Sequence, residues 1–212
     1  INIYPRINPQ KISVIYEAAE DKFSKFSENR KNIIEKQYDL KKYFLTQGTR
    51  EPRKNLKRII EAFILYKQIN PTSPYELAIS GKYGWGSDIL QYKRPDIKIL
   101  GYIPEKDLVP LHAAATCLVY PSLYEGFGLP VIKSLKVNVP VITSKDSAMS
   151  EIASTASILV NPESVEEIAS AMELITKNSS LRFRLIQNAK KISPKFSWLN
   201  TARETLKVYK SL

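Results

Sequence analysis

Short runs of apolar and β-branched residues alternate along the chain with longer stretches whose apolar positions recur every three or four residues. Short apolar runs bounded by turn residues are typical of buried strands, and the wider spacing is typical of amphipathic helices. The pattern predicts strands at residues 12–16, 43–46, 75–80, 97–100, 117–120, 139–143 and 156–160. It predicts helices near residues 55–69, 86–93, 104–114, 128–137, 146–153 and 163–176, and a solvent-facing helix plus loop at 23–42.

The alternation of strands and helices predicts the class of fold. It is typical of βαβ units, which form a parallel sheet covered by helices on both faces. Right-handed crossovers then give an α/β fold with a doubly wound, Rossmann-like parallel sheet. Ligands of such sheets bind at the carboxyl ends of the strands. Turns with glycine or proline follow four predicted strands, at Gly48, Gly81, Gly101 and Pro121, so we expect these turns to lie on one rim.

Two predicted helices carry additional signals. Asn161 is a favourable N-cap and Pro162 suits the first helical position, so they predict where the helix at 163–176 begins. The last segment, about residues 196–212, is expected to form a final helix. Its apolar residues recur at three- and four-residue steps: Leu199, Ala202, Leu206, Tyr209 and Leu212. A continuous stripe of this kind needs a surface to pack against.

Length and composition favour an ordinary globular domain. The 212 residues are enough for one α/β domain with a full core, and 43% of them are hydrophobic. No apolar run approaches the length that spans a bilayer, and the first residues show no signal-peptide pattern. The single cysteine, Cys117, is expected in the core, and the single histidine, His112, is expected to be packed or exposed rather than catalytic. One cysteine offers no disulfide framework, which favours a reducing cytoplasm.

The net charge of +11 leaves three interpretations, which are nucleic acid binding, attraction to an anionic membrane surface, and a generally basic solvated surface. Lys and Arg are spread along the chain, without a basic ribbon interleaved with aromatic residues and without a nucleic-acid-binding motif. We therefore expect no nucleic acid partner. Weak attraction to an anionic membrane surface is compatible with the charge.

Residues 121–133 read Pro-Ser-Leu-Tyr-Glu-Gly-Phe-Gly-Leu-Pro-Val-Ile-Lys and form the most informative stretch of the chain. A predicted strand leads into a glycine-containing turn, and a predicted helix follows from Leu129. This arrangement directs free backbone N–H groups at an anion. Glu125 lies at the turn, where a carboxylate can accept hydrogen bonds from sugar hydroxyls. No spacing suggests a metal site or a Ser-His-Asp triad, so we expect no cofactor and no metal ion.

This stretch resembles the signature of family-4 retaining glycosyltransferases with the GT-B fold, Glu-Gly-Phe-Gly-Leu-Pro. Residues 48–56, 81–86, 100–104 and 196–203 also resemble motifs of that family, in the family's order. The resemblance implies that residues 1–212 form a single domain, the carboxyl-terminal, donor-binding half of a GT-B architecture. It also implies that an amino-terminal domain supplies the acceptor site and that the final helix packs toward that domain.

The resemblance further implies roles for individual residues. Lys54 and Arg53 would neutralise the diphosphate of a nucleotide-sugar, where other enzymes use a metal ion, and Glu125 would complete the catalytic set by holding the donor sugar. The implied donor-binding residues are Gly48, Thr49, Tyr102, Ile103, Gly126, Phe127, Gly128, Leu129 and Lys133, with Tyr102 and Ile103 meeting the base. The competing interpretation is a solvated basic pair and a solvent-facing carboxylate.

Lys133 departs from the family pattern, which has at this position a second glutamate that holds the ribose hydroxyls. An ammonium cannot accept hydrogen bonds. Donor binding is therefore expected to be weaker by about 1–3 kcal/mol, unless Lys133 contacts a phosphate instead. Asn138 and Thr116 also depart from the family pattern, which favours Gly and Asp. These departures leave a degraded or repurposed site open.

The resemblance thus implies a retaining, metal-independent glycosyltransferase that transfers a sugar from a nucleotide-sugar to a glycan or lipid-linked acceptor, as in polysaccharide or lipopolysaccharide assembly. The implied location is the cytoplasm, including the inner face of the membrane. Two alternatives stay open. One is a truncated or degenerate non-catalytic glycosyltransferase-like domain, acting with or without a partner chain, and the other is a sugar-nucleotide 2-epimerase of the same architecture. For this chain alone we expect little or no transfer activity.

Overall fold

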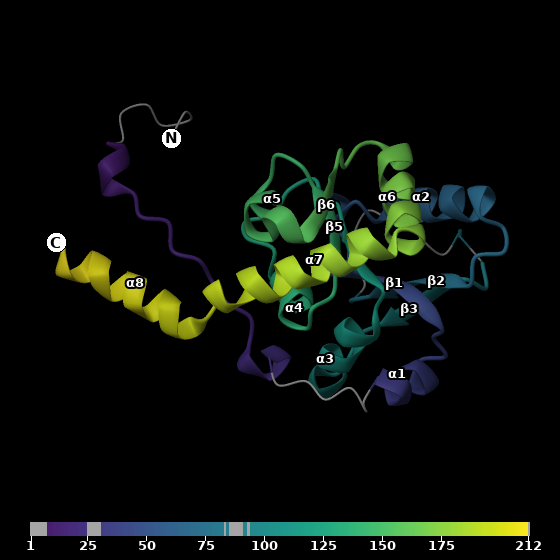
Figure 1. The fold of residues 1–212 in the computed structure, drawn as a ribbon, viewed down its shortest axis with the longest axis horizontal. Helices are drawn as coiled ribbons and strands as arrows, with labels where there is room; N and C mark the ends of the chain where they lie inside the picture. Colours follow the sequence, from purple (N-terminus) through teal and green to yellow (C-terminus); the bar gives the residue numbers. More distant parts are fainter. Residues whose placement is uncertain (1–7, 25–30, 83, 85–90, 93, 212) are drawn as a thin grey trace.

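The computed structural model describes residues 8–24, 31–82, 84, 91–92 and 94–211. Within these residues, six strands form one parallel sheet in the order β3-β2-β1-β4-β5-β6 (Figure 1). The strands are β1 (Lys42–Gln47), β2 (Tyr75–Ser80), β3 (Ile97–Gly101), β4 (Cys117–Tyr120), β5 (Val141–Ser144) and β6 (Ser157–Val160). The predicted Rossmann-like α/β class is confirmed.

The sheet is buried on both faces, as a parallel sheet flanked by helices requires. β1 pairs with β2 from Lys42 opposite Tyr75 onward, and with β4 at Phe44 opposite Cys117. Side chains alternate between the two faces of a strand. Phe44 therefore belongs to one hydrophobic core, while its neighbour Tyr43 belongs to the other.

Helices cover both faces of the sheet (Figure 1). They are α1 (Lys31–Gln37), α2 (Leu56–Ile69), α3 (Glu105–Ala114), α4 (Leu129–Lys136), α5 (Ala148–Ala153), α6 (Val165–Lys177), α7 (Ser179–Ile192) and α8 (Trp198–Lys210). On one face α2 and α6 pack together, and Phe63 and Met172 join the core that contains Phe44. On the other face α3 and α4 contribute Leu111 and Leu135 to the second core.

The strand order reverses where β1 pairs with β4, because β2 and β3 lie on one side of this pair and β5 and β6 lie on the other. Open α/β sheets bind ligands at such a switch point, outside the carboxyl ends of the strands. Since the described strands are all parallel, the turns at Gly48, Gly81, Gly101 and Pro121 share one rim, as predicted. The segments that follow β1 and β4 thus leave the sheet next to each other and define where a site can form.

The prediction of a strand at Ile12–Tyr16 is wrong. This segment pairs with no described strand, and Val14 is 75% exposed. An apolar β-branched run forms a strand only where another strand offers a hydrogen-bonding edge. The segment instead runs beside α8, where the Thr201 hydroxyl donates to the carbonyl oxygen of Tyr16 at 2.7 Å.

Two features of the helices differ from the prediction. α6 begins at Val165, because the Ser164 hydroxyl caps it by accepting from the backbone N–H of Glu167 at 3.1 Å. The Asn161 side chain instead accepts from the backbone N–H of Glu163 in the preceding turn, so the predicted start at Asn161 and Pro162 is wrong. α7 was not predicted, because its sequence is polar overall and it buries only two side chains, which are Leu185 and Ala189.

The segment predicted to face solvent at 23–42 contributes to the core instead. Phe23, Ile34 and Leu40 are buried, and α1 packs against α3. Charged and polar residues dominate residues 23–42, and the three apolar positions are too far apart to form a clear helical pattern. The helix predicted at 86–93 lies outside the described residues except for 91–92.

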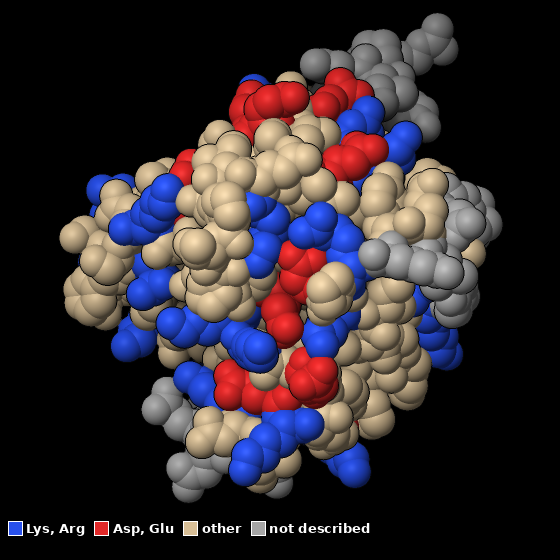
Figure 2. Space-filling model, turned by 90° about the vertical axis from the view of Figure 1, so that its right-hand side faces the viewer, with Lys and Arg blue, Asp and Glu red and all other residues tan. Residues whose placement is uncertain are grey.

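The described part of the chain contains no helix long and apolar enough to cross a membrane. On the face that Figure 2 shows, Lys and Arg side chains lie among Asp and Glu. Ion pairs among the described residues include Lys67 with Asp96 and Lys98 with Asp39.

α8 projects from the body of the domain on the same side as the amino-terminal segment (Figure 1). It buries none of its residues. Leu199, Leu206 and Tyr209 of the predicted apolar stripe are 60%, 51% and 69% exposed. The stripe is therefore uncovered in this structure.

The two hydrophobic cores predict the cost of removing an aromatic ring. Phe63→Ala is expected to lower the free energy of unfolding by about 3–5 kcal/mol, because it empties a fully buried site on α2. The matched control is Phe183→Ala on α7, where the ring is 64% exposed and the expected loss is below about 0.5 kcal/mol. Urea unfolding followed by circular dichroism measures both, and equal losses would contradict the assigned core.

Candidate active site

The segments that follow β1 and β4 are tied together by buried hydrogen bonds. After β1, residues Pro52–Lys54 form a short 3-10 turn, and Asn55 follows in the left-handed conformation with φ of 60°. The buried Asn55 amide donates to the carbonyl oxygens of Pro121 at 2.9 Å and Pro162 at 2.6 Å. The backbone N–H of Leu123 donates to the carbonyl oxygen of Arg53 at 2.8 Å. These bonds fix the basic turn beside the loop that carries Glu125.

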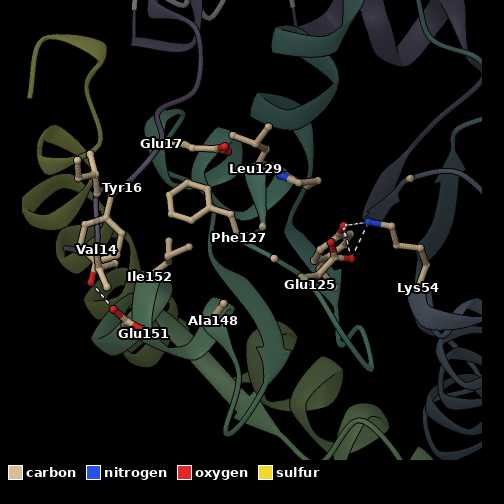
Figure 3. Close-up of a pocket in the computed structure, with 16 residues that line it drawn as sticks. Val14, Tyr16, Glu17, Lys54, Glu125, Phe127, Leu129, Ala148, Glu151 and Ile152 are labelled. Atoms are coloured by element: carbon tan, nitrogen blue, oxygen red, sulfur yellow. Dashed lines mark hydrogen bonds and ion pairs between the residues drawn. The ribbon is translucent and has the colours of Figure 1, made fainter. Parts of the chain in front are cut away.

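Glu125 is the centre of a compact charged cluster, and Figure 3 shows its contact with Lys54. Lys54 Nζ lies 2.6 Å from Oε1 of Glu125, and Arg53 Nη1 lies 3.0 Å from Oε2. The Tyr120 hydroxyl donates to Oε1 at 3.0 Å and accepts from Lys54 Nζ at 2.5 Å. The side chains of Glu125 and Lys54 are only 9% and 15% exposed, while that of Arg53 is 42% exposed. Arg53 Nε also lies 2.7 Å from Oε2 of Glu51, so two cations and two carboxylates meet at the switch point.

This environment keeps Glu125 ionised. Burial raises the pKa of Glu125, but the hydrogen bonds and charges of Lys54, Tyr120 and Arg53 outweigh burial and hold the pKa below its ordinary value. Burial and the neighbouring carboxylate raise the pKa of Tyr120 well above its ordinary value. The cluster thus contains a charged carboxylate and a neutral phenol at neutral pH.

The turn after Glu125 requires glycine at one position. Gly128 has φ of 107°, and an added Cβ would lie 2.8 Å from Cγ of Met149. α4 begins directly afterwards at Leu129, so the positive end of its dipole lies on the wall of the cavity that Lys54 and Glu125 also line. Cations and a helix amino end suit an anionic ligand such as a diphosphate.

A cavity of about 680 Å³ adjoins the cluster (Figure 3). It is lined by seven of the residues that the sequence singled out, namely Gly48, Lys54, Glu125, Gly126, Phe127, Gly128 and Leu129. Its other lining residues were not anticipated: Val14, Ile15, Tyr16, Glu17, Tyr120, Pro130, Ala148, Glu151 and Ile152. Tyr120 could have been identified as the last residue of a strand that precedes the motif. The 14–17 segment gave no such signal, because its apolar pattern predicted a strand.

The far end of the cavity is aromatic. The ring of Tyr16 stacks on Phe127 with centroids 6.1 Å apart and meets Phe196 edge-on at 5.8 Å. The Tyr16 hydroxyl donates to Glu151. One side chain of the amino-terminal segment thus touches the glycine turn, α5 and Phe196, which lies two residues before α8.

Four predicted donor-binding residues do not line this cavity. Thr49 is absent from the lining, and Ile103 is only 4% exposed within the core. Tyr102 is 64% exposed at the carboxyl end of β3, with Lys82 Nζ 5.3 Å from its ring centre. Lys133 turns elsewhere, because its Nζ lies 3.6 Å from Glu20 and 5.2 Å from the ring centre of Phe23.

His112 and Cys117 are packed, as expected. His112 is fully buried, with its ring nitrogens 2.8 Å from the Ser134 hydroxyl and 2.6 Å from the side-chain oxygen of Gln47. Burial, aided by the charge of Lys133, lowers the pKa of His112 to about 3, so the ring is neutral. In the part of the chain that the structure describes, no group of three His, Cys, Asp or Glu side chains is placed to hold a metal ion.

Comparison with known proteins places this geometry in a family. The family model described as "Glycosyl transferases group 1" matches residues 27–192. The O-antigen chain mannosyltransferase B of Escherichia coli is 34% identical over 176 residues, which cover 80% of this chain and 46% of that protein. The chain spans about half or less of the length of the first curated relatives that it matches.

Solved structures share the fold. A structure of Anabaena Alr3699/HepE in complex with UDP-glucose has a TM-score of 0.84 at 18% identity, covering 99% of this chain and 60% of that one. The C-terminal domain of a glycosyl transferase group 1 family protein (LpcC) from Francisella tularensis has a TM-score of 0.67 at 22% identity, covering 85% of this chain and 95% of that one. The family model covers most of the sequence, including the basic turn and the Glu125 motif. The chain therefore belongs to the group 1 glycosyl transferases.

Proposed function

We propose that this chain is the donor-binding domain of a retaining glycosyltransferase that transfers a sugar from a nucleotide-sugar to a glycan or lipid-linked acceptor. The observation that carries the proposal is the convergence of Lys54, Arg53 and Glu125 beside the amino end of α4, at the strand switch point. Membership in the group 1 family supports the reaction class. Relatives named as mannosyltransferases make a mannosyl donor the first to test.

The cluster suits the chemistry of a diphosphate leaving group. When the bond between sugar and diphosphate breaks, negative charge builds up on the departing phosphate oxygens, and fixed cations nearby stabilise that charge. Lys54 and Arg53 can supply this stabilising positive charge without a metal ion, so we propose a metal-independent site. Both cations contact Glu125 in this structure, so donor phosphates would compete with the carboxylate for them.

The donor would lie along the rim of the sheet. With its diphosphate at Lys54 and the amino end of α4, the cavity beyond Gly126 and Phe127 would receive the sugar, with Glu125 accepting from its hydroxyls. Thr49 would border the phosphate site from beside Gly48, and Tyr102 and Ile103 would meet the base after β3, mainly through their backbone atoms because the Ile103 side chain is buried. Lys133 lies next to Glu20, so it would reach the donor's ribose or phosphate only by leaving this ion pair.

We also propose that the described fold is one domain that works against a second domain of the same protein. The uncovered stripe of α8 and the coverage of only part of each relative support this arrangement. The second domain would supply the acceptor site. A cytoplasmic location is proposed from the family reaction, and the net charge of +11 supports weak contact with an anionic membrane surface.

The donor site predicts nucleoside diphosphate binding. Calorimetric titration of the chain with UDP, GDP and ADP is expected to give a millimolar or tighter Kd for one of them, unchanged by EDTA. Lys54→Met should weaken that binding about 10-fold or more, because a charge-assisted hydrogen bond is lost. Lys57→Met removes a 70% exposed lysine of α2 and is expected to change nothing. Failure of all three diphosphates to bind at millimolar concentration would refute the proposed function.

The ionised state of Glu125 predicts a pH-dependent stability difference. The folded pKa of Glu125 is below its ordinary value of 4.5, so its charge stabilises the fold above pH 4.5, and this contribution is lost as the pH falls through the folded pKa. Glu125→Gln should lower the free energy of unfolding by about 1–3 kcal/mol at pH 7, and the difference should shrink below pH 4.5.

Urea unfolding between neutral and acid pH measures this difference. Glu163→Gln replaces an exposed carboxylate before α6 and is the matched control, with no expected change at pH 7. A loss that is the same at every pH would show that the charge of Glu125 does not contribute.

The proposed second domain predicts that α8 contributes little to the fold of this chain. Ending the chain after Ser197 removes the helix, and it should lower the free energy of unfolding by only about 1 kcal/mol, because α8 buries no residue. Hydrogen exchange should be fast in α8 here and slower in a longer chain that includes a preceding domain. Equal exchange in the two chains would contradict docking of this helix.

A further inference from the structure

Tyr120 is a buried phenol that reaches the cavity from inside the sheet. It is the last residue of β4 and only 1% exposed, and its ring belongs to the core shared with α3 and α4. β4 is held between β1 and β5, and the Thr143 hydroxyl donates to the carbonyl oxygen of Tyr120 at 3.0 Å. Tyr120 is thus anchored in the sheet, whereas Lys54 and Glu125 lie on the segments that follow the strands.

The Tyr120 hydroxyl makes two hydrogen bonds of opposite sense. It accepts from Lys54 Nζ at 2.5 Å and donates to Oε1 of Glu125 at 3.0 Å. Lys54 Nζ also contacts Oε1 directly at 2.6 Å, so the three groups close a triangle. An ammonium only donates and a carboxylate only accepts, whereas a neutral hydroxyl does both. Burial and the nearby carboxylate, which raise the pKa of Tyr120, keep this hydroxyl protonated.

The two distances from Lys54 Nζ to Tyr120 place the ammonium beyond the hydroxyl edge of the ring. Nζ is 2.5 Å from the hydroxyl oxygen but 5.1 Å from the ring centre, so it lies close to the ring plane and contacts Tyr120 through the hydroxyl. The lysine side chain is 15% exposed, so this contact lies in a largely water-excluded site. The Tyr120 hydroxyl therefore limits where the ammonium can move.

We propose that Tyr120 is a positioning residue of the donor site, which directs the Lys54 ammonium toward the diphosphate and keeps Glu125 in place when Lys54 changes partner. The inference rests on the proposed function. In the free protein, Glu125 has Lys54, Arg53 and Tyr120 as partners. When a diphosphate takes the two cations, the Tyr120 hydroxyl remains bonded to one carboxylate oxygen, and the other oxygen is free to accept from a sugar hydroxyl.

The first experiment tests the triangle in the free protein. Tyr120→Phe keeps the ring and removes only the hydroxyl. The carboxyl group of Glu125 is titrated by carbon NMR, and its pKa is expected to rise in Tyr120→Phe, because a hydrogen bond to the charged form is lost. The control is Tyr43→Phe, which removes another buried tyrosine hydroxyl, one that donates to the carbonyl oxygen of Leu111 at 2.7 Å. An unchanged Glu125 titration in Tyr120→Phe would overturn the proposal.

The second experiment tests positioning with a double-mutant cycle on nucleoside diphosphate binding. Tyr120→Phe alone should weaken the affinity about 5- to 10-fold, but less than about twofold when Lys54 is already replaced by Met. Tyr43→Phe should leave the affinity unchanged. A purely structural role predicts the same loss in both backgrounds, and that result would overturn the inference for Tyr120 alone.

Failure of the proposed function and failure of the positioning role of Tyr120 give different results. If the unaltered chain binds no diphosphate while Tyr120→Phe still shifts the Glu125 titration, the triangle exists but the proposed function fails, and the positioning role fails with it. If the unaltered chain binds a diphosphate and the cycle shows no coupling, the proposed function stands and Tyr120 is only a core residue.

Discussion

The pairing of β1 with β4 is the constraint on which the rest of this structure depends. It reverses the strand order at the centre of the sheet, so the segments after two distant strands leave the sheet side by side. Asn55 then bonds the backbone of the second segment from the first, which sets the distance between a basic turn and an acidic loop. Without this pairing, Lys54 and Glu125 would have no reason to meet, because 71 positions separate them in the sequence.

The site combines groups that would be costly to bury separately. Two cations next to each other at a helix start oppose the helix dipole, and a carboxylate with so little exposure would lose much of its hydration. Together they satisfy one another, and the Tyr120 hydroxyl adds an acceptor for Lys54 and a donor for Glu125. The two cations are already placed to bind an anion, because in this structure they bind the carboxylate of Glu125.

Much of the fold was predictable from the sequence, and less of the site. Periodicity located the buried strands closely, because burial on both faces requires continuous apolar runs, and it also located six of the helices. It failed for Ile12–Tyr16, since pairing depends on a neighbouring edge that composition does not report, and for α7, which buries too few side chains to leave a pattern. The meeting of Lys54 with Glu125 followed from family resemblance, because no local rule relates the two. The roles of Tyr120 and of the aromatic end of the cavity could be seen only in the structure. From sequence, a tyrosine in a strand is expected to be a core residue, and nothing indicates which groups its hydroxyl contacts.

The Tyr16 ring links two distant parts of the molecule. Its backbone carbonyl is held by Thr201 of α8, and its ring lies on Phe127 in the glycine turn. One residue of the amino-terminal segment thus contacts both α8 and the wall of the cavity, through one hydrogen bond and one ring stack. The projecting helix and the binding pocket are therefore neighbours of a common residue.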